Sequence, residues 1–363
     1  MEENKQNIYI IQPQLAVYRI PVYEQMGMDS PEVTVFHEGG LDGADTVIPH
    51  CKTKILRRIN FIKGYYQKGL IFNILKKKPE KIFYYADLKN MTLWLSIIIC
   101  KIYGGDFYLH GQGVFKKADL NKFEKLIWYL ALRLCTKFIA YNELVSHEME
   151  VLFPSIQKKI TYCNNTLQDS FLMNIIPNIY RNKGILFIGR IREGANIELL
   201  ANAVIEINMK NLNKDYITLN IVGIGDAFVK LKEKYITYSF IKWHGKIYSN
   251  MEIAKIAEYC SIGVYPGDGG LSVVHYMSLG LFPIVHGAWK KHMGPEPWYV
   301  KNISEQFLFD RNSSDSLKKI IVDVFSDDER LIELRHRSRK FFEYLSTPSY
   351  SNRLLNIINP KKI

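Results

Sequence analysis

Two arginines that follow a strand-like segment are suited to binding phosphate. In Ile185–Leu200 an apolar run ends at Gly189, and Arg190 and Arg192 follow in the loop before a helix that is expected to begin near Asn196. A guanidinium group matches the oxygens of a phosphate or diphosphate, so two of them at the end of a strand would hold such a group beside the helix. The alternative is that both arginines pair with carboxylates at the surface.

A glycine-rich loop further along the chain carries the strongest local signal. Residues 264–285 read as strand, loop, helix and strand, with Gly280 and Pro283 at the helix exit. Such a loop presents backbone N–H groups and the positive end of a helix dipole to an anion. The predicted anion-binding residues are Gly269, Gly270, Leu271 and Ser272. Loops of this composition also occur as tight turns without a ligand.

A glycine pair at Gly223 and Gly225 follows another strand but does not complete a dinucleotide-binding fingerprint. The third glycine position is occupied by Phe228, which makes a dehydrogenase the weaker interpretation. The two glycines are more typical of a tight turn beside a ligand. The sequence contains no Asp-x-Asp motif, so we expect no required metal.

Short apolar strands must position these motifs, and they alternate with amphipathic segments in both halves of the chain. This alternation is typical of parallel β-α units with helices on both faces of a sheet. The expected strands are Ile8–Ile11, Val33–Phe36, Ile82–Tyr85, Phe107–Leu109 and Phe138–Ala140 in the first half, and Gly184–Ile188, Ile217–Val222, Ile241–His244, Ile262–Tyr265 and Phe282–His286 in the second.

The pattern predicts an α/β chain of two Rossmann-like, doubly wound domains. We expect an N-terminal domain at residues 1–165, a turn-rich linker at 166–183, a second domain at 184–340 and a C-terminal helix at 341–363 that crosses back to the N-terminal domain. Two such domains facing one another would bind a ligand in the cleft outside the carboxyl ends of their strands.

The order of the motifs resembles that of a known family. A strand with Gly-Arg, then Ile-Val-Gly-x-Gly, then His-Gly-Lys-Ile, then Pro-Gly-x-Gly-Gly-Leu-Ser-x-x-His-x-Met-x-x-Gly-x-x-Pro-Ile-Val resembles the C-terminal domain of retaining glycosyltransferases of family 4, which have the GT-B fold. The resemblance covers about residues 184–300 and is fainter at Gln12–Tyr23, His110-Gly111 and Lys159–Thr166. It implies a nucleoside diphosphate sugar donor in the C-terminal domain and an acceptor bound mainly by the N-terminal domain.

The resemblance also implies roles for single residues. Arg190 would hold the diphosphate, and the loop Gly269–Ser272 would cap the distal phosphate. The segment made of Gly245, Lys246 and Ile247 would border the base. Further donor-binding residues would be Gly189, Arg192, Gly223 and His275.

The sequence departs from the family pattern at three positions. A lysine that usually follows the arginine by five positions is Ala195 here, and Arg192 is its substitute. The family's paired glutamates fall on Gly267 and His275. An imidazole at His275 can still bond a ribose hydroxyl, whereas Gly267 offers no side chain. Asp268 is the nearest carboxylate, and we assign it a catalytic role.

In the N-terminal half, His110 ends a strand at the place where the family has a histidine that contacts the transferred sugar or stabilises charge in the transition state. The alternative is a histidine tied to a neighbouring carbonyl. Tyr18 and Arg19 follow the first strand and are assigned to the acceptor or its phosphate, although Arg19 would equally suit a helix start at the surface.

The resemblance further implies a retaining transfer. The acceptor hydroxyl would attack on the face that the diphosphate leaves, and the leaving phosphate would act as the base. Arg190 and the helix N-terminus would stabilise the charge that develops on the diphosphate.

The net charge of +12 is confined to one quarter of the chain. Residues 51–140 hold 18 Lys/Arg and five Asp/Glu, a net charge of +13, and the remainder is close to neutral. Aromatic residues are interleaved with the basic ones, which is compatible with an anionic membrane surface, a solvated helix face or nucleic acid. Together with the motifs above, the charge favours a membrane surface that carries a lipid-linked acceptor, and no nucleic-acid partner.

Composition and the apolar segments indicate the cellular location and the source of the protein. Five scattered cysteines without a C-x-x-C pair and a start without an apolar signal segment favour the cytoplasm. The apolar runs are too short to span a membrane, which leaves a peripheral position on the inner face of the cytoplasmic membrane. A composition rich in Lys, Ile and Asn points to a bacterial source and to cell-envelope polysaccharide biosynthesis.

The sequence therefore predicts a metal-independent glycosyltransferase without a cofactor, which moves a sugar from a nucleoside diphosphate sugar to a saccharide or lipid-linked saccharide. The alternatives are a basic nucleic-acid-binding protein and a nucleotide-sugar-modifying Rossmann enzyme.

Overall fold

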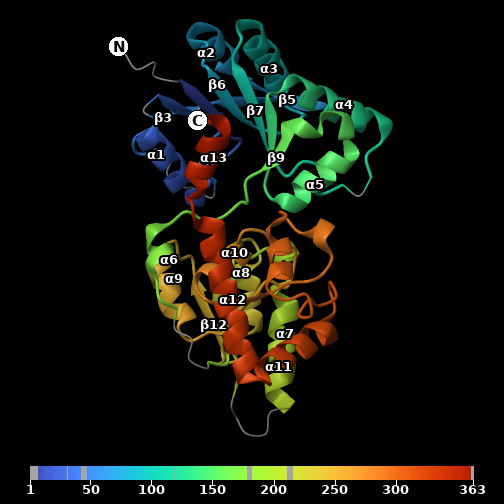
Figure 1. Cartoon of the computed structure of the whole chain (residues 1–363). Coiled ribbons are helices and arrows are strands. Elements are labelled where there is room, and N and C mark those ends of the chain that lie inside the picture. Colours follow the sequence, from blue (N-terminus) through green and yellow to red (C-terminus); the bar gives the residue numbers. More distant parts are fainter. Residues whose placement is uncertain are drawn as a thin grey trace. The chain divides into compact units, whose positions relative to one another are not determined.

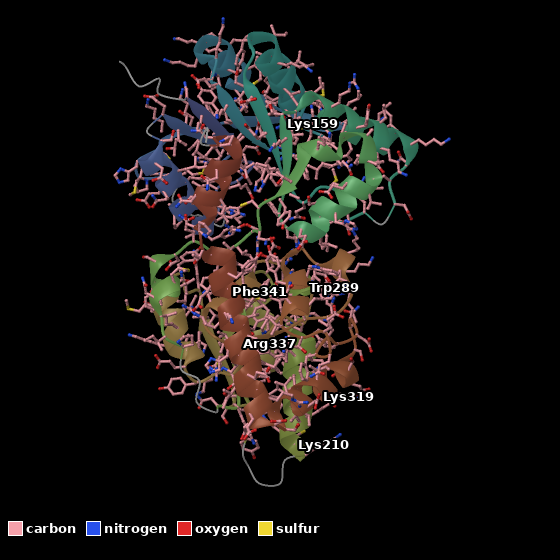
Figure 2. All side chains as sticks on the ribbon, viewed as in Figure 1. Lys159, Lys210, Trp289, Lys319, Arg337 and Phe341 are labelled. Carbon is pink, nitrogen blue, oxygen red and sulfur yellow. The ribbon has the colours of Figure 1, made fainter. Side chains whose placement is uncertain are left out.

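The chain divides into two compact α/β units (Figure 1). The computed structural model describes residues 7–30, 32–41, 47–117, 119–177, 182–210 and 216–360. Unit 1 comprises Met1–Gln168 together with Pro348–Ile363, and unit 2 comprises Asp169–Thr347. In each unit, a parallel sheet is covered by helices whose side chains fill the space against it (Figure 2).

Unit 1 contains a seven-stranded parallel sheet in the order β3-β2-β1-β6-β7-β8-β9. Alternate residues of its central strands enter two separate cores: Tyr9 and Ile11 of β1 belong to one, and Ile8 and Ile10 to the other. This burial on both faces explains why β1 is apolar throughout. The strands are β1 (Ile8–Ile11), β2 (Val33–His37), β3 (Lys52–Ile55), β6 (Lys81–Tyr85), β7 (Asp106–Gly111), β8 (Lys137–Ala140) and β9 (Ile160–Tyr162).

Two sets of helices cover this sheet. The core that contains Tyr9 also includes residues of α2 (Leu70–Lys77), α3 (Met91–Tyr103), α4 (Lys122–Leu134) and α5 (Glu143–Leu152). The opposite core includes residues of α1 (Ile20–Asp29) and of the C-terminal helix α13 (Tyr350–Ile358). The last helix of the chain is therefore part of unit 1, where it packs against α1.

Unit 2 contains a five-stranded parallel sheet in the order β12-β11-β10-β13-β14. Its strands are β10 (Gly184–Ile188), β11 (Thr218–Val222), β12 (Ile241–Gly245), β13 (Ile262–Val264) and β14 (Phe282–Ile284). Its helices are α6 (Ser170–Asn174), α7 (Ile197–Lys210), α8 (Phe228–Lys234), α9 (Asn250–Ala257), α10 (Ser272–Ser278), α11 (Ser314–Phe325) and α12 (Asp328–Ser346).

Arginines of α12 tie the end of unit 2 to its beginning. Arg339 donates hydrogen bonds to the carbonyls of Leu172 and Met173, each at 2.8 Å. The buried Arg335 donates from Nε to the carbonyl of Gly280 at 2.9 Å. Carbonyl oxygens at the ends of loops and helices need hydrogen-bond donors. The guanidinium groups of Arg335 and Arg339 on α12 supply these donors.

The ten strands expected from the sequence are all present, with ends within a few residues of the expected ones. Three features were not expected: the edge strand β3, the strand β9, and an antiparallel pair formed by β4 (Arg57–Phe61) and β5 (Gly64–Lys68). Strands β3 and β4 are exposed and contain basic residues. They therefore lack the apolar run by which a buried strand is recognised in a sequence. The helices α12 and α13 are separated at Thr347–Ser349, where Pro348 cannot continue a helix.

Within the described ranges, no helix has the length and apolar character needed to cross a membrane.

Candidate active site

Two loops that follow neighbouring strands of unit 2 are packed against each other with no space for side chains. A Cβ atom on Gly223 would lie 1.9 Å from the carbonyl oxygen of Gly189, and one on Gly225 would lie 2.3 Å from that of Ile191. The N–H of Ile191 donates to the carbonyl of Ile224 at 2.9 Å. The glycines thus bring the loop after β11 directly beside the arginine loop after β10.

Gly267 stands where the family has the first of its paired glutamates, and the structure has no room for a side chain there. A Cβ atom on Gly267 would lie 2.2 Å from the carbonyl oxygen of Gly194 and within 3 Å of the backbone of Ala195. The N–H of Asp268 donates to that same Gly194 carbonyl at 3.0 Å. Ala195 is fully buried. Glycine at 267 and alanine at 195 therefore belong to one packed arrangement of two loops.

The glycine-rich loop precedes α10 as expected, but one of its backbone donors is used inside the protein. The N–H of Gly269 donates to Nδ1 of His292 at 3.1 Å. Among the residues described, the N–H groups of Gly270, Leu271 and Ser272 have no hydrogen-bond partner. Three adjacent donors at the start of α10 are therefore available to an anion.

The two arginines lie on the loop between β10 and α7. The Arg190 side chain is half exposed, and its Nη2 lies 4.0 Å from a highly exposed Asp226 carboxylate, a distance at which an ion pair contributes little. Burial raises the pKa of Tyr265, and the nearby charge and hydrogen-bonding capacity of Arg192 oppose that rise. The Tyr265 ring packs beside Gly269, with 3.3 Å between ring carbons and a Cβ placed there. Arg192 therefore lies near the glycine-rich loop.

Asp268 occupies a closed cluster of charged and polar groups. Arg311 donates to both carboxylate oxygens, from Nε at 2.9 Å and from Nη2 at 3.1 Å, and Nε2 of His286 lies 3.3 Å from Oδ1. Burial alone would raise the pKa of Asp268, but the hydrogen bonds and charge of Arg311, and then those of His286, hold it below its usual value. The carboxylate is ionised and engaged, so it is suited to fixing the loop rather than to moving a proton.

The imidazole of His275 is half-buried, and its Nε2 is buried without a hydrogen-bond partner among the described residues. Burial lowers the pKa of His275 to about 4 in spite of the negative charge of Asp169, so the ring is neutral at pH 7. Asp169 accepts a hydrogen bond from Asn250 Nδ2 at 2.7 Å. A neutral imidazole with an orphaned nitrogen can bond a hydroxyl group.

The predicted base-bordering segment continues from β12. Gly245 has a φ of +71°, which favours glycine there, and its carbonyl accepts the Gly223 N–H at 2.7 Å. Lys246 places its Nζ 4.5 Å from the centroid of the Tyr248 ring. The segment through Ile247 is exposed or half-buried, and it is linked to the glycine pair through the Gly223–Gly245 hydrogen bond.

In unit 1, His110 lies at the end of β7 and is only 3% exposed. Its Nδ1 lies 2.9 Å from the carbonyl of Ile139, so that nitrogen carries the proton. Its Nε2 then accepts from the Tyr350 hydroxyl at 3.1 Å. Burial, followed by the charge of Arg19, lowers the pKa of His110 to about 3. The carbonyl contact matches the structural alternative considered above, and contact of His110 with a substrate stays a prediction.

Arg19 is a buried guanidinium without a carboxylate partner in the described part of the chain. Nη2 donates to Oδ1 of Asn165. The guanidinium carbon lies 4.9 Å from the ring centroid of Tyr350, 5.3 Å from that of Tyr18 and 6.0 Å from that of Tyr141. Arg19 is 9% exposed, so the surface position considered above is wrong, and the charge rests among aromatic rings.

Gln12 adds an unsatisfied donor to the same edge of the sheet. It follows β1, the strand that lies between β2 and β6, and its Nε2 is buried without a partner among described residues. From β1 the chain continues outward to β2 and β3 on one side, and it then returns to β6 on the other side of β1. Such a reversal of strand order is the switch point at which open α/β sheets bind ligands.

Sequence reasoning did not find several residues of these sites. Arg311 and Tyr350 come from distant parts of the chain and carry no local motif. His286 and His292 stack with ring centroids 3.9 Å apart; only the position of His286 shortly after β14 was a signal. Gln12 lies in the segment Gln12–Tyr23 that the resemblance included, but the sequence does not show that its amide nitrogen is buried without a hydrogen-bond partner among the described residues.

A cavity of about 660 Å³ lies elsewhere in unit 2. It is lined by residues at the beginning of β10 and β11 and in the second half of α9, such as Gly184, Thr218 and Ile256. It contains none of the predicted site residues. The described residues also include no group of His, Cys, Asp and Glu that could hold a metal ion.

The glycine pair and the two arginines lie in adjoining loops of unit 2, and the N–H groups of Gly270, Leu271 and Ser272 begin α10. Residues 175–341 match the family model described as glycosyl transferases, group 1. No curated protein matches the chain in sequence. The matched segment contains the predicted donor-binding residues, from Gly189 to His275.

Solved structures share the fold over the whole chain. HepE from Anabaena in complex with UDP has a TM-score of 0.71 at 13% identity, with 97% of this chain and 99% of HepE covered. Sucrose-phosphate synthase from Thermosynechococcus elongatus has a TM-score of 0.66 at 16% identity, with 97% and 98% covered. WaaG, a glycosyltransferase involved in lipopolysaccharide biosynthesis, has a TM-score of 0.62 at 10% identity, with 97% and 100% covered.

These likenesses show that the chain has the GT-B fold of two Rossmann-like domains. Because the sequence identities are only 10 to 16%, these comparisons establish the fold of the chain and nothing more. Residues 175–341 are in addition similar to the family of glycosyl transferases, group 1.

Proposed function

We propose that the protein is a retaining glycosyltransferase that transfers a sugar from a nucleoside diphosphate sugar to a saccharide or lipid-linked saccharide. The observation that carries this proposal is the loop cluster of unit 2, where Arg190 and Arg192 lie in the loop joined to Gly223 and Gly225, and three free N–H groups begin α10. This set of donors suits a diphosphate. The match of residues 175–341 to glycosyl transferases supports the same reading.

In this proposal each donor-binding group has a distinct task. Arg190 and Arg192 bind the diphosphate, and the N–H groups of Gly270, Leu271 and Ser272 bind its distal phosphate. His275 offers its orphaned Nε2 to a ribose hydroxyl, and the Gly245–Ile247 segment borders the base. HepE has been solved with UDP and with UDP-glucose, which makes UDP-sugars the first donors to test.

Asp268 takes a different role from the catalytic one expected. Its bidentate bond to Arg311 and its contact with His286 leave it engaged on both oxygens. We propose that it is a positioning residue that fixes the glycine-rich loop beside Arg192.

The proposed reaction needs no protein carboxylate as base. The acceptor hydroxyl attacks on the face that the diphosphate leaves, and its proton passes to the departing phosphate oxygen. The chain contributes by stabilising charge on that phosphate, and one well-placed donor is worth roughly 3–4 kcal/mol in a transition state. The donor set contains cations and N–H groups, which supports a metal-independent transfer.

We propose that unit 1 binds the acceptor. Support comes from Arg19, a buried cation without a carboxylate partner among the described residues, and from the orphaned Gln12 amide at the switch point of the sheet. Tyr18 is exposed next to Arg19 and would contact the acceptor itself. His110, neutral and fixed by Ile139 and Tyr350, would present a rigid ring edge rather than a titrating group.

The charge of residues 51–140 supports a place at a membrane. We propose that the protein is cytoplasmic and peripheral on the inner face of the membrane, where it serves cell-envelope polysaccharide biosynthesis on a lipid-linked acceptor. The net charge of +13 in this segment would favour anionic lipid headgroups.

Donor turnover tests the proposal. The purified chain is incubated with UDP-, GDP-, CMP- and dTDP-sugars and with saccharide acceptors, and NMR follows release of the nucleotide and the first-formed anomer of the released or transferred sugar. We expect one donor to be turned over with its anomeric configuration retained, and at the same rate in the presence of EDTA. An inverted configuration would contradict the retaining mechanism, and a donor that binds without any release would contradict transfer.

A further inference from the structure

The outer face of α3 is apolar although it lies at the surface of unit 1. Among Met91–Tyr103 only Lys101 is charged. One side of α3 packs into the core, and the other presents Met91, Leu95, Ile98 and Ile102, which are 43 to 80% exposed. Their spacing of four, three and four residues places them on one stripe of the helix. A helix that is apolar on all sides is normally covered.

The elements that pack against α3 extend this apolar surface. Helices α2 and α4 and strand β5 contact α3, and α2 and α3 run side by side in Figure 1. On α4 the exposed residues Phe123, Leu126 and Leu130 repeat a helical spacing. Further exposed apolar residues are Phe72 and Leu75 on α2, and Phe61 and Ile62 at the turn between β4 and β5.

Exposed lysines surround the apolar residues. They are Lys63 at the β4–β5 turn, Lys76, Lys77 and Lys78 at the end of α2, Lys101 on α3, and Lys122 and Lys125 on α4. Apolar residues next to basic ones on the same elements are typical of helices that lie in a membrane interface, with the lysine heads among the phosphates.

The charge decides between a bilayer and a second copy of the chain. Self-association through this face would bring two surfaces of the +13 segment together, and like charges in contact are unfavourable. An anionic bilayer instead offers both an apolar interior for the stripe and phosphates for the lysines.

We propose that α2, α3, α4 and the β4–β5 turn form a membrane-docking face, in which the α3 stripe enters the headgroup–acyl boundary of an anionic bilayer. This inference refines the membrane part of the proposed function, and it assigns the binding to apolar insertion in addition to charge. Its test requires no sugar transfer, so its failure and the failure of the proposed transfer reaction are separate results.

The experiment measures binding of the full chain to phosphatidylcholine vesicles with and without phosphatidylglycerol, at low and at high salt. The first variant is L95Q/I98Q/I102Q, since glutamine keeps the helix propensity of α3. The second is K76Q/K77Q/K78Q. A matched control, V229Q/M251Q/V322Q, removes three exposed apolar residues of unit 2. Circular dichroism and the melting temperature without any ligand establish that each variant is folded.

The wild type and the control should bind the anionic vesicles tightly and the neutral ones weakly. The lysine variant should lose about fivefold in affinity for each lysine at low salt and little at high salt. The α3 variant should lose on the order of tenfold or more at both salt concentrations, because apolar insertion is not screened.

Three results would overturn the proposal. One is a wild type that does not bind anionic vesicles at low salt. Another is an α3 variant that binds like the control. The third is an α3 variant that changes only the oligomeric state in gel filtration, or only capture of a protein partner, while vesicle binding stays at the wild-type level.

Discussion

At the scale of single residues, the buried histidines make the protein sensitive to acid. Burial lowers the pKa of His110 to about 3 and that of His292 to about 3. An unfolded chain titrates histidine near 6.5. Between these values the unfolded state binds more protons than the folded state, so stability is lost as the pH falls through 6.5 and towards 3.

We therefore expect each of these two histidines to cost about 2 kcal/mol of unfolding free energy between pH 7 and pH 5. Urea unfolding at the two pH values measures the cost. His110→Gln should reduce the pH-dependent loss of unfolding free energy by about 2 kcal/mol, the contribution of one histidine. His147→Gln, at an exposed position, should leave that loss unchanged. An undiminished pH dependence in His110→Gln would refute the neutral assignment.

The pair of Asp268 and Arg311 allows a second prediction at this scale. If Asp268 positions the loop through Arg311, then Asp268→Ala and Arg311→Ala should each weaken nucleotide binding on the order of tenfold, and the double variant should be no worse than either. Their coupling free energy in a double-mutant cycle should then be about 1.4 kcal/mol, the equivalent of one tenfold effect.

Isothermal titration with the preferred nucleotide gives these affinities, and turnover gives the matching rates. A direct chemical role for Asp268 predicts another pattern, in which Asp268→Ala abolishes turnover while Arg311→Ala retains most of it. That pattern would return Asp268 to the catalytic role expected from the sequence.

At the scale of elements, the C-terminal helix α13 is a structural part of unit 1. Tyr350, Leu354 and Ile358 are almost fully buried in the core that also contains Val22 and Met26 of α1. The carbonyl of Ile358 accepts hydrogen bonds from Lys81 Nζ at 2.7 Å and from the Tyr108 hydroxyl at 3.0 Å. Removing α13 would expose this core and leave buried polar groups without partners.

Deletion of residues 348–363 should therefore destabilise unit 1 and leave unit 2 folded. In calorimetry we expect the unfolding of unit 1 to move to a lower temperature, while a nucleotide still shifts the unfolding of unit 2. Tyr350→Phe is the gentler variant: it leaves His110 Nε2 without a donor and should cost about 1–3 kcal/mol. Unchanged stability of unit 1 in the deletion would show that α13 is dispensable there.

The elements also show what the sequence could predict. Buried strands such as β1 and β10 are recognisable because an apolar run marks a strand that is covered on both faces. The exposed strands β3 and β4 were missed because basic residues hide their pattern. The glycine-rich loop was recognised from its composition, which is a local property.

The partners of the predicted site residues were beyond the sequence because they come from distant positions. Arg311 lies 43 residues from Asp268, and Tyr350 lies 240 residues from His110. The glycine at 267 was read as a missing glutamate, whereas the structure shows that the Gly194 carbonyl fills that space. Only packing distinguishes an absent functional group from a position that admits no side chain.

At the scale of the whole molecule, the two units offer different chemical groups to a ligand. Unit 2 offers the exposed Arg190, the half-buried Arg192 and the N–H groups at the start of α10, and unit 1 offers Arg19, the Gln12 amide and the lysine-rich face around α3. We propose that the first set holds the donor and the second the acceptor and the membrane that carries it. The central claim is that unit 2 binds a nucleoside diphosphate through Arg190.

Nucleotide-dependent thermal stability tests this claim most directly. UDP, GDP, CMP and dTDP are added to the wild type, to Arg190→Ala and to a control, Arg337→Ala, which removes an exposed arginine of α12 (Figure 2). At about 100 times its dissociation constant, a nucleotide stabilises the folded state by ~2.7 kcal/mol. We predict that one nucleotide raises the melting temperature of the wild type and of Arg337→Ala by several degrees and that of Arg190→Ala far less. An equal shift in Arg190→Ala, or no shift of the wild type with any of the four, would contradict the account.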